Sequence, residues 1–362
     1  MIQIVDRPQT ALEYSRFTPD ELRSRINARK AEVNAVILGH NYQRVEIQAV
    51  SDYLGDSLGL SQEAAQTSAD VIVFCGVHFM AETAKILSPR KTVLMPDLRA
   101  GCPMADFVTG EGIRRLKAEH PGAAVISYVN STAEVKAESD ICCTSSNAVE
   151  VVESFGRDRT ILFVPDRNLA RYTAEQTGRP CLTTTEIEKL GGETLPEGTI
   201  IAWDGYCYVH DDLVLDELAA ARARHPNAKV VIHPEARREL LDQADFVTST
   251  SRMVQIAEAH DELIIGTERG LIDRLKQRFP EKTLIPISGA AICGNMKMNT
   301  LAKLAWSLDH MQHEVVLDEE IRLRAERALR RMLELSGGWR APSPEEVALE
   351  MADVERSGCG CA

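Results

Sequence analysis

The sequence predicts an α/β protein made of three similar three-layer αβα units, each with a doubly wound parallel sheet. Short apolar runs of strand length alternate with amphipathic helical patterns, which is typical of parallel strands joined by crossover helices. One order of parts also occurs three times along the chain, which indicates an internal repeat. The length of 362 residues leaves room for two or three domains.

The individual elements follow from the apolar pattern. Nine runs are expected to be strands: 35–38, 71–74, 92–95, 124–129, 160–164, 199–203, 230–233, 263–266 and 283–287. Helical patterns are expected at 46–68, 81–87, 112–120, 212–224 and 270–278. Helix N-caps are expected at Thr18, Ser145 and Ser251, and Glu21 completes a capping box after Thr18.

Each repeat opens with a strand that runs into a polar triplet and ends with a cysteine in a glycine-flanked loop. The opening strands begin at residues 35, 124 and 230, a spacing that suits one small doubly wound domain each. The expected organisation is a helical N-terminal extension (1–34), unit one (35–110, with part of the C-terminal region), unit two (111–210), unit three (211–300), C-terminal helices (301–340) and a flexible tail (341–362). We infer that the three sets of strand-end loops meet in a pseudo-three-fold arrangement around one central site, because open α/β sheets bind ligands there.

Composition excludes several classes of function. The net charge of −13 argues against nucleic-acid or anionic-membrane partners, which select basic surfaces. The first residues lack a signal-peptide pattern, and no run of about 18 uncharged apolar residues occurs, so we expect a cytoplasmic protein. In that reducing compartment the nine cysteines are not expected to form a disulfide framework.

Three cysteines occupy equivalent places in the repeats: Cys102, Cys207 and Cys293. They lie in loops, whereas Cys75 lies in an apolar strand. Three converging thiolates suit an iron–sulfur cluster with one non-cysteine position, or a zinc ion with one open site. The open position would let the metal act as a Lewis acid. Spacing alone does not separate iron–sulfur from zinc, and three unrelated loop cysteines are the simpler alternative.

Polar side chains follow the opening strand of every unit. They are His40 and Tyr42, then Tyr128 and Asn130, then His233 and Glu235. A lone histidine at a strand end is usually a structural hydrogen-bonding group, but the parallel placement favours proton transfer by these side chains. His210 follows Cys207 by three residues and is either a group near the metal or a plain loop residue.

Hydroxyl-rich turns form a third set, made of Asp56 with Ser57, Ser145 with Ser146, and Ser249 with Thr250. Helix N-termini bind phosphate and carboxylate groups through free backbone N–H groups, so these turns predict an anion pocket. Ordinary N-capping explains any single one of them better than a binding role does. Lys297 either neutralises an anionic substrate or is simply solvated. Cys359 and Cys361 lie in the tail that we expect to be flexible.

Taken together, these motifs resemble the quinolinate synthase family, in order from about residue 35 to 310. The matching motifs are His40-Asn41-Tyr42-Gln43, Gly55-Asp56-Ser57-Leu58, Gly101-Cys102, Tyr128-Val129-Asn130, Cys143-Thr144-Ser145-Ser146-Asn147, His233-Pro234-Glu235 and Met296-Lys297-Met298-Asn299-Thr300 after Cys293. The resemblance implies a transferase of NAD biosynthesis that condenses iminoaspartate with dihydroxyacetone phosphate to give quinolinate, phosphate and water. It also implies three α/β domains in pseudo-three-fold arrangement around a [4Fe–4S] cluster.

The resemblance assigns roles residue by residue. It places the cluster on Cys102, Cys207 and Cys293. It places phosphate and carboxylate contacts on His40, Asp56, Ser57, Ser145 and Thr250, with Asn130, His233 and Ser249 nearby. It places proton-handling groups on Tyr42, Tyr128 and Glu235, with His210 near the cluster. It further implies a functional link to the L-aspartate-oxidising enzyme that supplies iminoaspartate. Two alternatives stay open: a zinc-dependent lyase or hydrolase that uses the same cysteines, and a non-catalytic three-domain small-molecule binding protein.

Overall fold

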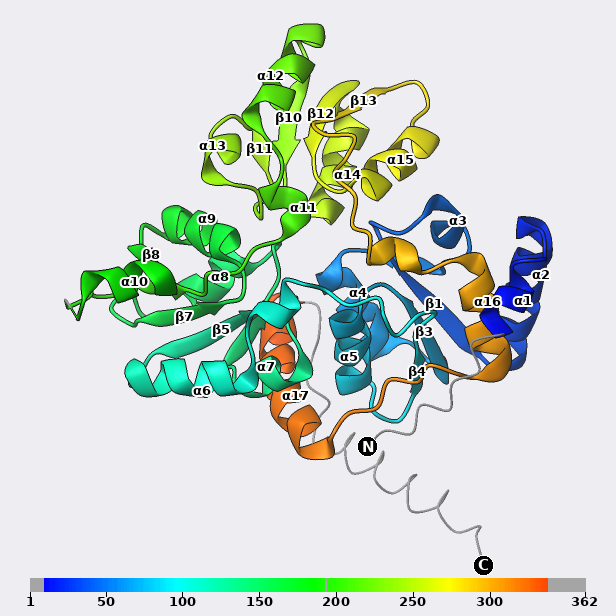
Figure 1. Ribbon diagram of the computed structural model, residues 1–362, viewed down its shortest axis with the longest axis horizontal. Helices are drawn as coiled ribbons and strands as arrows, with labels where there is room; N and C mark the ends of the chain where they lie inside the picture. Colours follow the sequence, from blue (N-terminus) through cyan, green and yellow to red (C-terminus); the bar gives the residue numbers. More distant parts are fainter. Residues whose placement is uncertain (1–9, 193, 338–362) are drawn as a thin grey trace, which may run out of the picture.

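The computed structural model describes residues 10–192 and 194–337. In these residues, thirteen strands form three separate sheets, and all neighbouring strands run parallel. Figure 1 shows the three sheets with their helices as three lobes that meet near the centre of the view. The predicted α/β fold class, with three similar parallel units, is confirmed.

The three sheets share one strand order. In each unit the second strand along the chain lies at one edge, beside the first strand. The third strand lies on the other side of the first, and the strand that leads to the cysteine loop comes next. The first sheet is β2 (Tyr53–Gly55), β1 (Ala35–His40), β3 (Val71–Cys75) and β4 (Thr92–Leu94). The second is β6 (Ile141–Cys143), β5 (Ala124–Tyr128), β7 (Ile161–Val164), β9 (Ile200–Ala202) and an added edge strand, β8 (Cys181–Thr183). The third is β11 (Phe246–Val247), β10 (Lys229–Ile232), β12 (Glu262–Gly266) and β13 (Thr283–Pro286).

Helices connect the strands and cover the sheets. The first lobe contains α1 (Thr10–Tyr14), α2 (Pro19–Glu32), α3 (Val45–Gln48), α4 (Ser57–Gln66) and α5 (His78–Leu87). The second contains α6 (Gly110–Glu119), α7 (Ala133–Ala137), α8 (Ala148–Glu153), α9 (Arg167–Thr177) and α10 (Thr184–Leu190). The third contains α11 (Tyr208–Asp211), α12 (Leu215–Arg224), α13 (Arg238–Leu241), α14 (Thr250–Ala259) and α15 (Arg269–Arg278). Short 3-10 turns follow two of the cysteines, at Ala105–Phe107 and Met296–Met298.

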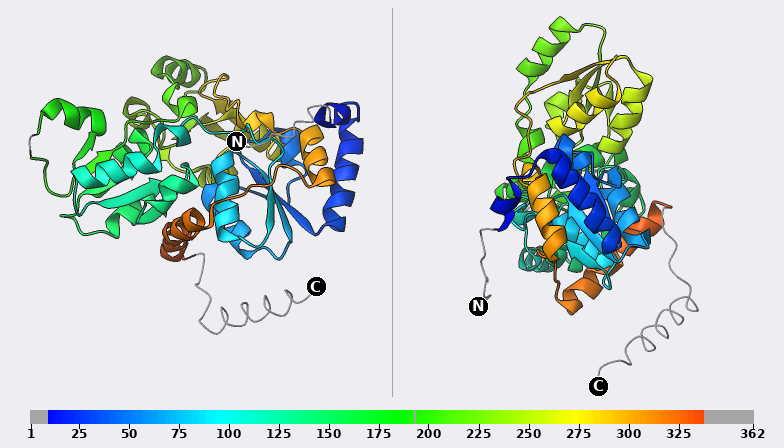
Figure 2. Two further views of the ribbon diagram at one scale, coloured as in Figure 1. Left: turned by 60° about the horizontal axis from the view of Figure 1, so that its bottom comes forward. Right: turned by 90° about the vertical axis from the view of Figure 1, so that its right-hand side faces the viewer.

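Two further helices, α16 (Leu301–His310) and α17 (Glu319–Leu335), return the chain to the first two lobes. Helix α16 packs against α1 and α2, whereas α17 packs against α5 of the first lobe and α7 of the second. Figure 2 shows α17 in orange beneath these two lobes. Because α5 lies between β3, α4 and α17, nearly all of its side chains are buried. The unit boundaries near residues 110, 210 and 300 stay predictions.

The predicted continuous helix at 46–68 is wrong. The segment forms α3, then the edge strand β2, then α4. The helix stops before Asp52, whose Oδ2 accepts the N–H of Ile37 in β1 at 2.8 Å. Asp140 and Asp245 make the same 2.8 Å bond to the opening strands of their units. The repeat equivalent of these two residues in the first unit is therefore Asp52.

The expected N-caps are only partly correct. Thr18 and Glu21 form the predicted capping box at the start of α2. Ser145 and Ser251 do not cap helices, because α8 begins after Asn147 and α14 after Ser249. The expected tail at 341–362, with Cys359 and Cys361, lies outside the described residues, as do residues 1–9 of the extension. Among the helices that the structure describes, none has the length and apolar character needed to cross a membrane.

Candidate active site where the three sheets meet

One pocket lies where the carboxyl ends of the three sheets face one another. Every residue to which the family resemblance assigned a role lines it, except Ser249. Those lining residues are His40, Tyr42, Asp56, Ser57, Cys102, Tyr128, Asn130, Ser145, Cys207, His210, His233, Glu235, Thr250 and Cys293. The structure thus brings together side chains that are up to about 250 residues apart in sequence, while their individual roles stay predictions.

The repeat explains why these residues meet. The polar triplets follow the opening strands β1, β5 and β10, the hydroxyl turns follow the edge strands β2, β6 and β11, and the cysteines follow β4, β9 and β13. All these strands point their carboxyl ends the same way within each sheet, so each unit delivers three loops to one edge.

The cysteine loops are held by a backbone bond that recurs in all three units. The first residue of the helix after the third strand donates its N–H to a carbonyl two residues before the cysteine. The bonds run from His78 to Ala100, from Arg167 to Gly205 and from Arg269 to Ala291, each at 2.8 Å. Each cysteine therefore has the same position relative to its sheet.

Two buried carboxylates hold two of the cysteines more tightly. Asp166 caps α9 through the N–H of Leu169 at 2.7 Å and also accepts the N–H of Cys207 at 3.2 Å. Glu268 precedes α15 and accepts the N–H of Cys293 at 3.0 Å. Both acids are fully buried. The sequence analysis missed them, although each directly precedes the helix that follows a buried strand, where an N-cap is expected.

The three pocket cysteines are free thiols. Burial raises the pKa of Cys102 to about 12 and raises that of Cys207 and Cys293 as well. A buried thiolate needs a cationic partner, and a metal centre supplies one because thiolates bind as its ligands. One free thiol from each sheet, turned into a shared pocket, fits a cofactor held by three cysteines.

Glu235 is the most densely contacted acid of the pocket. Its Oε2 lies 2.6 Å from Nδ1 of His210 and 3.6 Å from Nδ1 of His233, and its Oε1 accepts a 3.4 Å bond from Asn130. Tyr128 also hydrogen-bonds this carboxylate. Burial works to raise the pKa of Glu235, but the two histidines and the hydrogen bonds lower it to about 2. Glu235 is therefore an ionised carboxylate at neutral pH.

His40, His233, Tyr42 and Tyr128 are neutral near pH 7. Burial lowers the pKa of His40 to about 4 and that of His233 to about 3. Burial also raises the pKa of Tyr42 and Tyr128, so both phenols keep their protons. The Tyr42 hydroxyl lies 2.6 Å from the hydroxyl of Thr267 and 3.3 Å from Nε2 of His210. The tyrosines can donate protons and the carboxylate of Glu235 can accept one.

A further set of pocket residues presents hydroxyl groups and helix N-termini. Ser57 is the first residue of α4 and Thr250 the first residue of α14, so their backbone N–H groups start helices of ten residues each. Asp56 caps α4 through Gly59 and accepts a 3.2 Å bond from Ser146 of the second unit. These residues therefore have the features of an anion site.

Ser249 and Lys297 are not among the residues that line the pocket. Ser249 caps α14 without a side-chain hydrogen bond, and its role as a substrate contact stays a prediction. Lys297 is not a solvated lysine, because its Nζ lies 2.9 Å from Glu268 and donates to the carbonyl of Tyr42, while its role toward an anionic substrate stays a prediction. It links the loop of the third cysteine to the first unit.

The fold and the pocket define a class: proteins of three repeated parallel α/β units whose strand ends enclose one pocket of thiols, acids and bases. The family described as "Quinolinate synthetase A protein" matches residues 24–334, and the chain belongs to this family. The resemblance noted from the motifs is confirmed.

Curated relatives agree over nearly their whole length. The chain is 49% identical over 318 residues to the quinolinate synthase of Desulforudis audaxviator (strain MP104C), which covers 87% of the chain and 99% of the relative. It is 51% identical over 306 residues to that of Dehalococcoides mccartyi (strain CBDB1), covering 84% and 95%. It is 45% identical over 344 residues to that of Synechococcus sp. (strain ATCC 27144 / PCC 6301 / SAUG 1402/1), covering 93% and 100%.

Proposed function

We propose that this protein is a quinolinate synthase, which condenses iminoaspartate with dihydroxyacetone phosphate to give quinolinate, phosphate and water for NAD biosynthesis. The observation that carries the proposal is the single pocket that joins three thiols, an ionised carboxylate, two protonated tyrosines and an anion site from three different sheets. Family membership supports it independently. We further propose that an L-aspartate-oxidising enzyme supplies the iminoaspartate.

The proposed cofactor is a [4Fe–4S] cluster held by Cys102, Cys207 and Cys293. When bound, it supplies an iron without a cysteine ligand, which can act as a Lewis acid on a substrate oxygen. The alternative, one zinc ion on all three cysteines, needs sulfurs about 3.8 Å apart, from Zn–S bonds of about 2.3 Å in a tetrahedron. Among the described residues, the one compact group of potential ligands within 4.8 Å is a different set, Cys207 with His210 and Glu235. The spread of the cysteines favours the cluster.

Two sets of pocket residues divide the work between binding and proton transfer. The N-termini of α4 and α14, with their hydroxyl groups, suit the phosphate of dihydroxyacetone phosphate and the carboxylates of iminoaspartate. In the second set, Glu235 can take a proton from a carbon beside a carbonyl, and the hydroxyls of Tyr42 and Tyr128 can return protons to departing oxygens. Apolar residues that also line the pocket, among them Phe79, would keep water from the imine.

The first test is iron and sulfide analysis of anaerobically purified protein, combined with a quinolinate assay. We expect about four irons and four sulfides per chain in the wild type. Cys102→Ala, Cys207→Ala and Cys293→Ala should each lose the cluster and quinolinate formation. The matched control is Cys75→Ala, since Cys75 is buried in β3 and does not line the pocket. Zinc in place of iron, or a cluster that survives loss of one pocket cysteine, would contradict the proposal.

A second test isolates the acid–base groups. Tyr42→Phe keeps the ring but removes the hydroxyl that contacts Thr267 and His210. We expect it to keep the cluster and to lower kcat about 10²- to 10⁴-fold, the usual range for general acid–base catalysis. Full kcat in this variant would exclude Tyr42 from proton transfer.

A further inference from the structure

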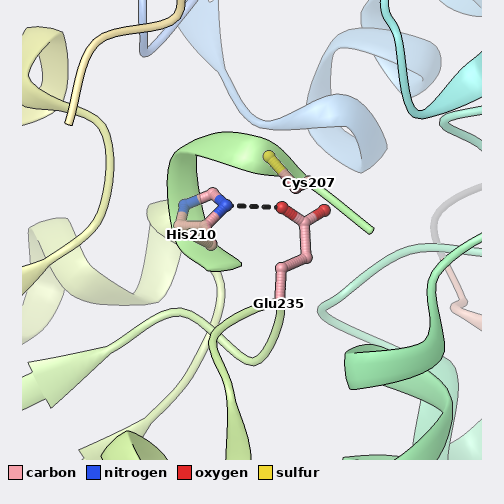
Figure 3. A group of neighbouring side chains, drawn as sticks. All are labelled: Cys207, His210 and Glu235. Atoms are coloured by element: carbon pink, nitrogen blue, oxygen red, sulfur yellow. Dashed lines mark ion pairs between the residues drawn. The ribbon is translucent and has the colours of Figure 1, made fainter. Parts of the chain in front are cut away.

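Cys207, His210 and Glu235 form a compact group beside the three-cysteine set, with one ligand atom from each residue within 4.8 Å of the others. Figure 3 shows the thiol, the imidazole and the carboxylate turned toward one another. We propose that the cluster-free protein binds one zinc ion at this group, at a site that shares only Cys207 with the three-cysteine site. The ion would use Sγ of Cys207, Nδ1 of His210 and a carboxylate oxygen of Glu235.

The local fold sets the spacing of these ligands. Cys207 is the N-cap of α11 and His210 lies in its only turn, so a Cys-x-x-His pair projects from one side of a helical turn. Glu235 comes from the loop after β10 and is 2% exposed, while His210 is 1% exposed. All three residues line the central pocket, which gives an ion a path of entry.

The environment of His210 is the strongest evidence for a metal ligand. Its Nε2 lies 3.0 Å from the hydroxyl of Thr267, a contact that holds the ring and lets Nε2 carry the hydrogen. Nδ1 then presents a lone pair. It lies 2.6 Å from Glu235 but has no partner with hydrogen-bond geometry. Two electron-rich atoms this close need a proton or a cation to offset their repulsion. A zinc ion bound to both would move them to about 3.3 Å apart, the separation that bonds of about 2.0–2.1 Å set in a tetrahedron. Metal-bound histidines usually have such an outer hydrogen bond on the second nitrogen.

The other two ligands are supported in the same way. Glu235 accepts a hydrogen bond from Asn130 on its second oxygen, and the backbone N–H of Cys207 is held by Asp166. Sulfur, imidazole nitrogen and carboxylate oxygen together select zinc over magnesium or calcium, which prefer oxygen ligands alone. On binding, the Cys207 thiol gives its proton to solvent and the thiolate joins the ion, while a water completes the tetrahedron.

One consequence depends on the proposed function, whereas the zinc site itself does not. If Cys207 also holds the iron–sulfur cluster, one sulfur cannot serve both centres. Zinc and the cluster would then exclude each other. In the zinc-bound protein Glu235 would be a zinc ligand and would not be free for proton transfer. The cluster-free protein with zinc bound would need to release that zinc before a cluster could assemble.

The test uses the full chain with Cys102→Ala and Cys293→Ala, which removes the three-cysteine set but leaves the proposed ligands intact. Zinc is titrated against a chromophoric chelator, and Co²⁺ is used as a spectroscopic probe for a thiolate ligand. We expect one zinc per chain and a cobalt–thiolate absorption band. Adding His210→Ala or Cys207→Ala should weaken zinc binding by more than the roughly 10- to 100-fold that loss of an outer-shell partner costs. Adding Thr267→Val, which removes the outer contact to His210 together with the contact to Tyr42 but leaves all three ligands in place, should fall within this range.

The matched control on the same background is His225→Ala. Nδ1 of His225 lies 2.7 Å from Glu262, a histidine–glutamate pair with the same spacing but outside the compact group with a cysteine. It should not change zinc binding, and circular dichroism should show that each variant folds. No stoichiometric zinc in the double variant, or binding indifferent to both His210 and Cys207, would overturn the site. Either result would leave the iron and quinolinate assays of the wild type untouched.

Discussion

Gly205, two residues before Cys207, allows a close backbone approach that no other residue would permit. A Cβ at this position would lie 2.5 Å from the carbonyl oxygen of Pro165 and 3.0 Å from the ring of Phe107. Contacts under 3.0 Å are essentially never seen for a real Cβ, so the loop of Gly205→Ala must move by about 0.9 Å to reach the 3.4 Å at which ordinary contact begins. Overpacking of this kind typically costs about 1–3 kcal/mol. In the wild type the N–H of Cys207 donates to Oδ2 of Asp166 at 3.2 Å, and we expect the shift to lengthen this bond.

The assay for Gly205→Ala combines urea unfolding with iron analysis after anaerobic purification. We expect a free energy of unfolding lower by about 1–3 kcal/mol and less than half the iron of the wild type. Gly289→Ala is the matched control, because Gly289 lies in the loop before Cys293 and a Cβ there would have no atom within 4 Å. If both variants keep wild-type stability and iron, the close approach does not position Cys207 and the reasoning fails.

Three further predictions concern charged groups. Asp166→Asn keeps one acceptor for the helix cap but loses the bond to the N–H of Cys207, so its free energy of unfolding in urea should be lower by about 1–3 kcal/mol. The control is Asp318→Asn at an exposed helix cap, which should change the free energy of unfolding little. Burial raises the pKa of Asp97, but hydrogen bonds from two cations outweigh burial and lower the pKa. The stabilisation by Asp97 is therefore complete above the ordinary pKa of about 3.9. As the pH falls below that value, the difference in the free energy of unfolding between the wild type and Asp97→Asn should shrink. Burial lowers the pKa of Lys136, which costs stability below that pKa, whereas its Nζ also donates to the carbonyl of Ser131. The stability of Lys136→Met relative to the wild type in urea unfolding should therefore decrease as the pH rises toward the ordinary lysine pKa of about 10.4.

The sequence predicted the long buried strands, the repeat and nearly all of the pocket. Strands such as β3 are continuous apolar runs because helices cover both faces of a parallel sheet, and this makes them visible in one dimension. The polar residues after them were recognisable because they recur in register. Their meeting at one pocket was an inference from topology, and the structure confirms that they share it.

The features that the sequence did not reveal depend on few residues or on distant partners. The edge strands β2, β6 and β11 have two or three residues each, too few for a periodic pattern. Asp52 could not be separated from a helix interior, because its partner Ile37 lies fifteen positions away in another strand. Lys297 reads as a surface lysine until Glu268 is known to be buried beside it.

The three units share a backbone, but they hold their cysteines with different carboxylates. Asp166 and Glu268 act from the cap of the helix after the third strand, whereas the equivalent residue in the first unit is Val77, which cannot accept a hydrogen bond. The loop of Cys102 depends on Asp97 in its place.

Asp97 accepts the backbone N–H of Arg99 at 2.9 Å and lies 2.6 Å from Nζ of Lys303 in α16. Of the three cysteine loops, the loop of Cys102 is thus the one whose carboxylate, Asp97, pairs with a cation from the C-terminal helix α16. The C-terminal part of the chain, which passes back to the first lobe, therefore does more than cover its sheet: it neutralises the acid that shapes the first cysteine loop. A charge change in α16 should consequently act on the pocket through Cys102 before it acts through either of the other two cysteines.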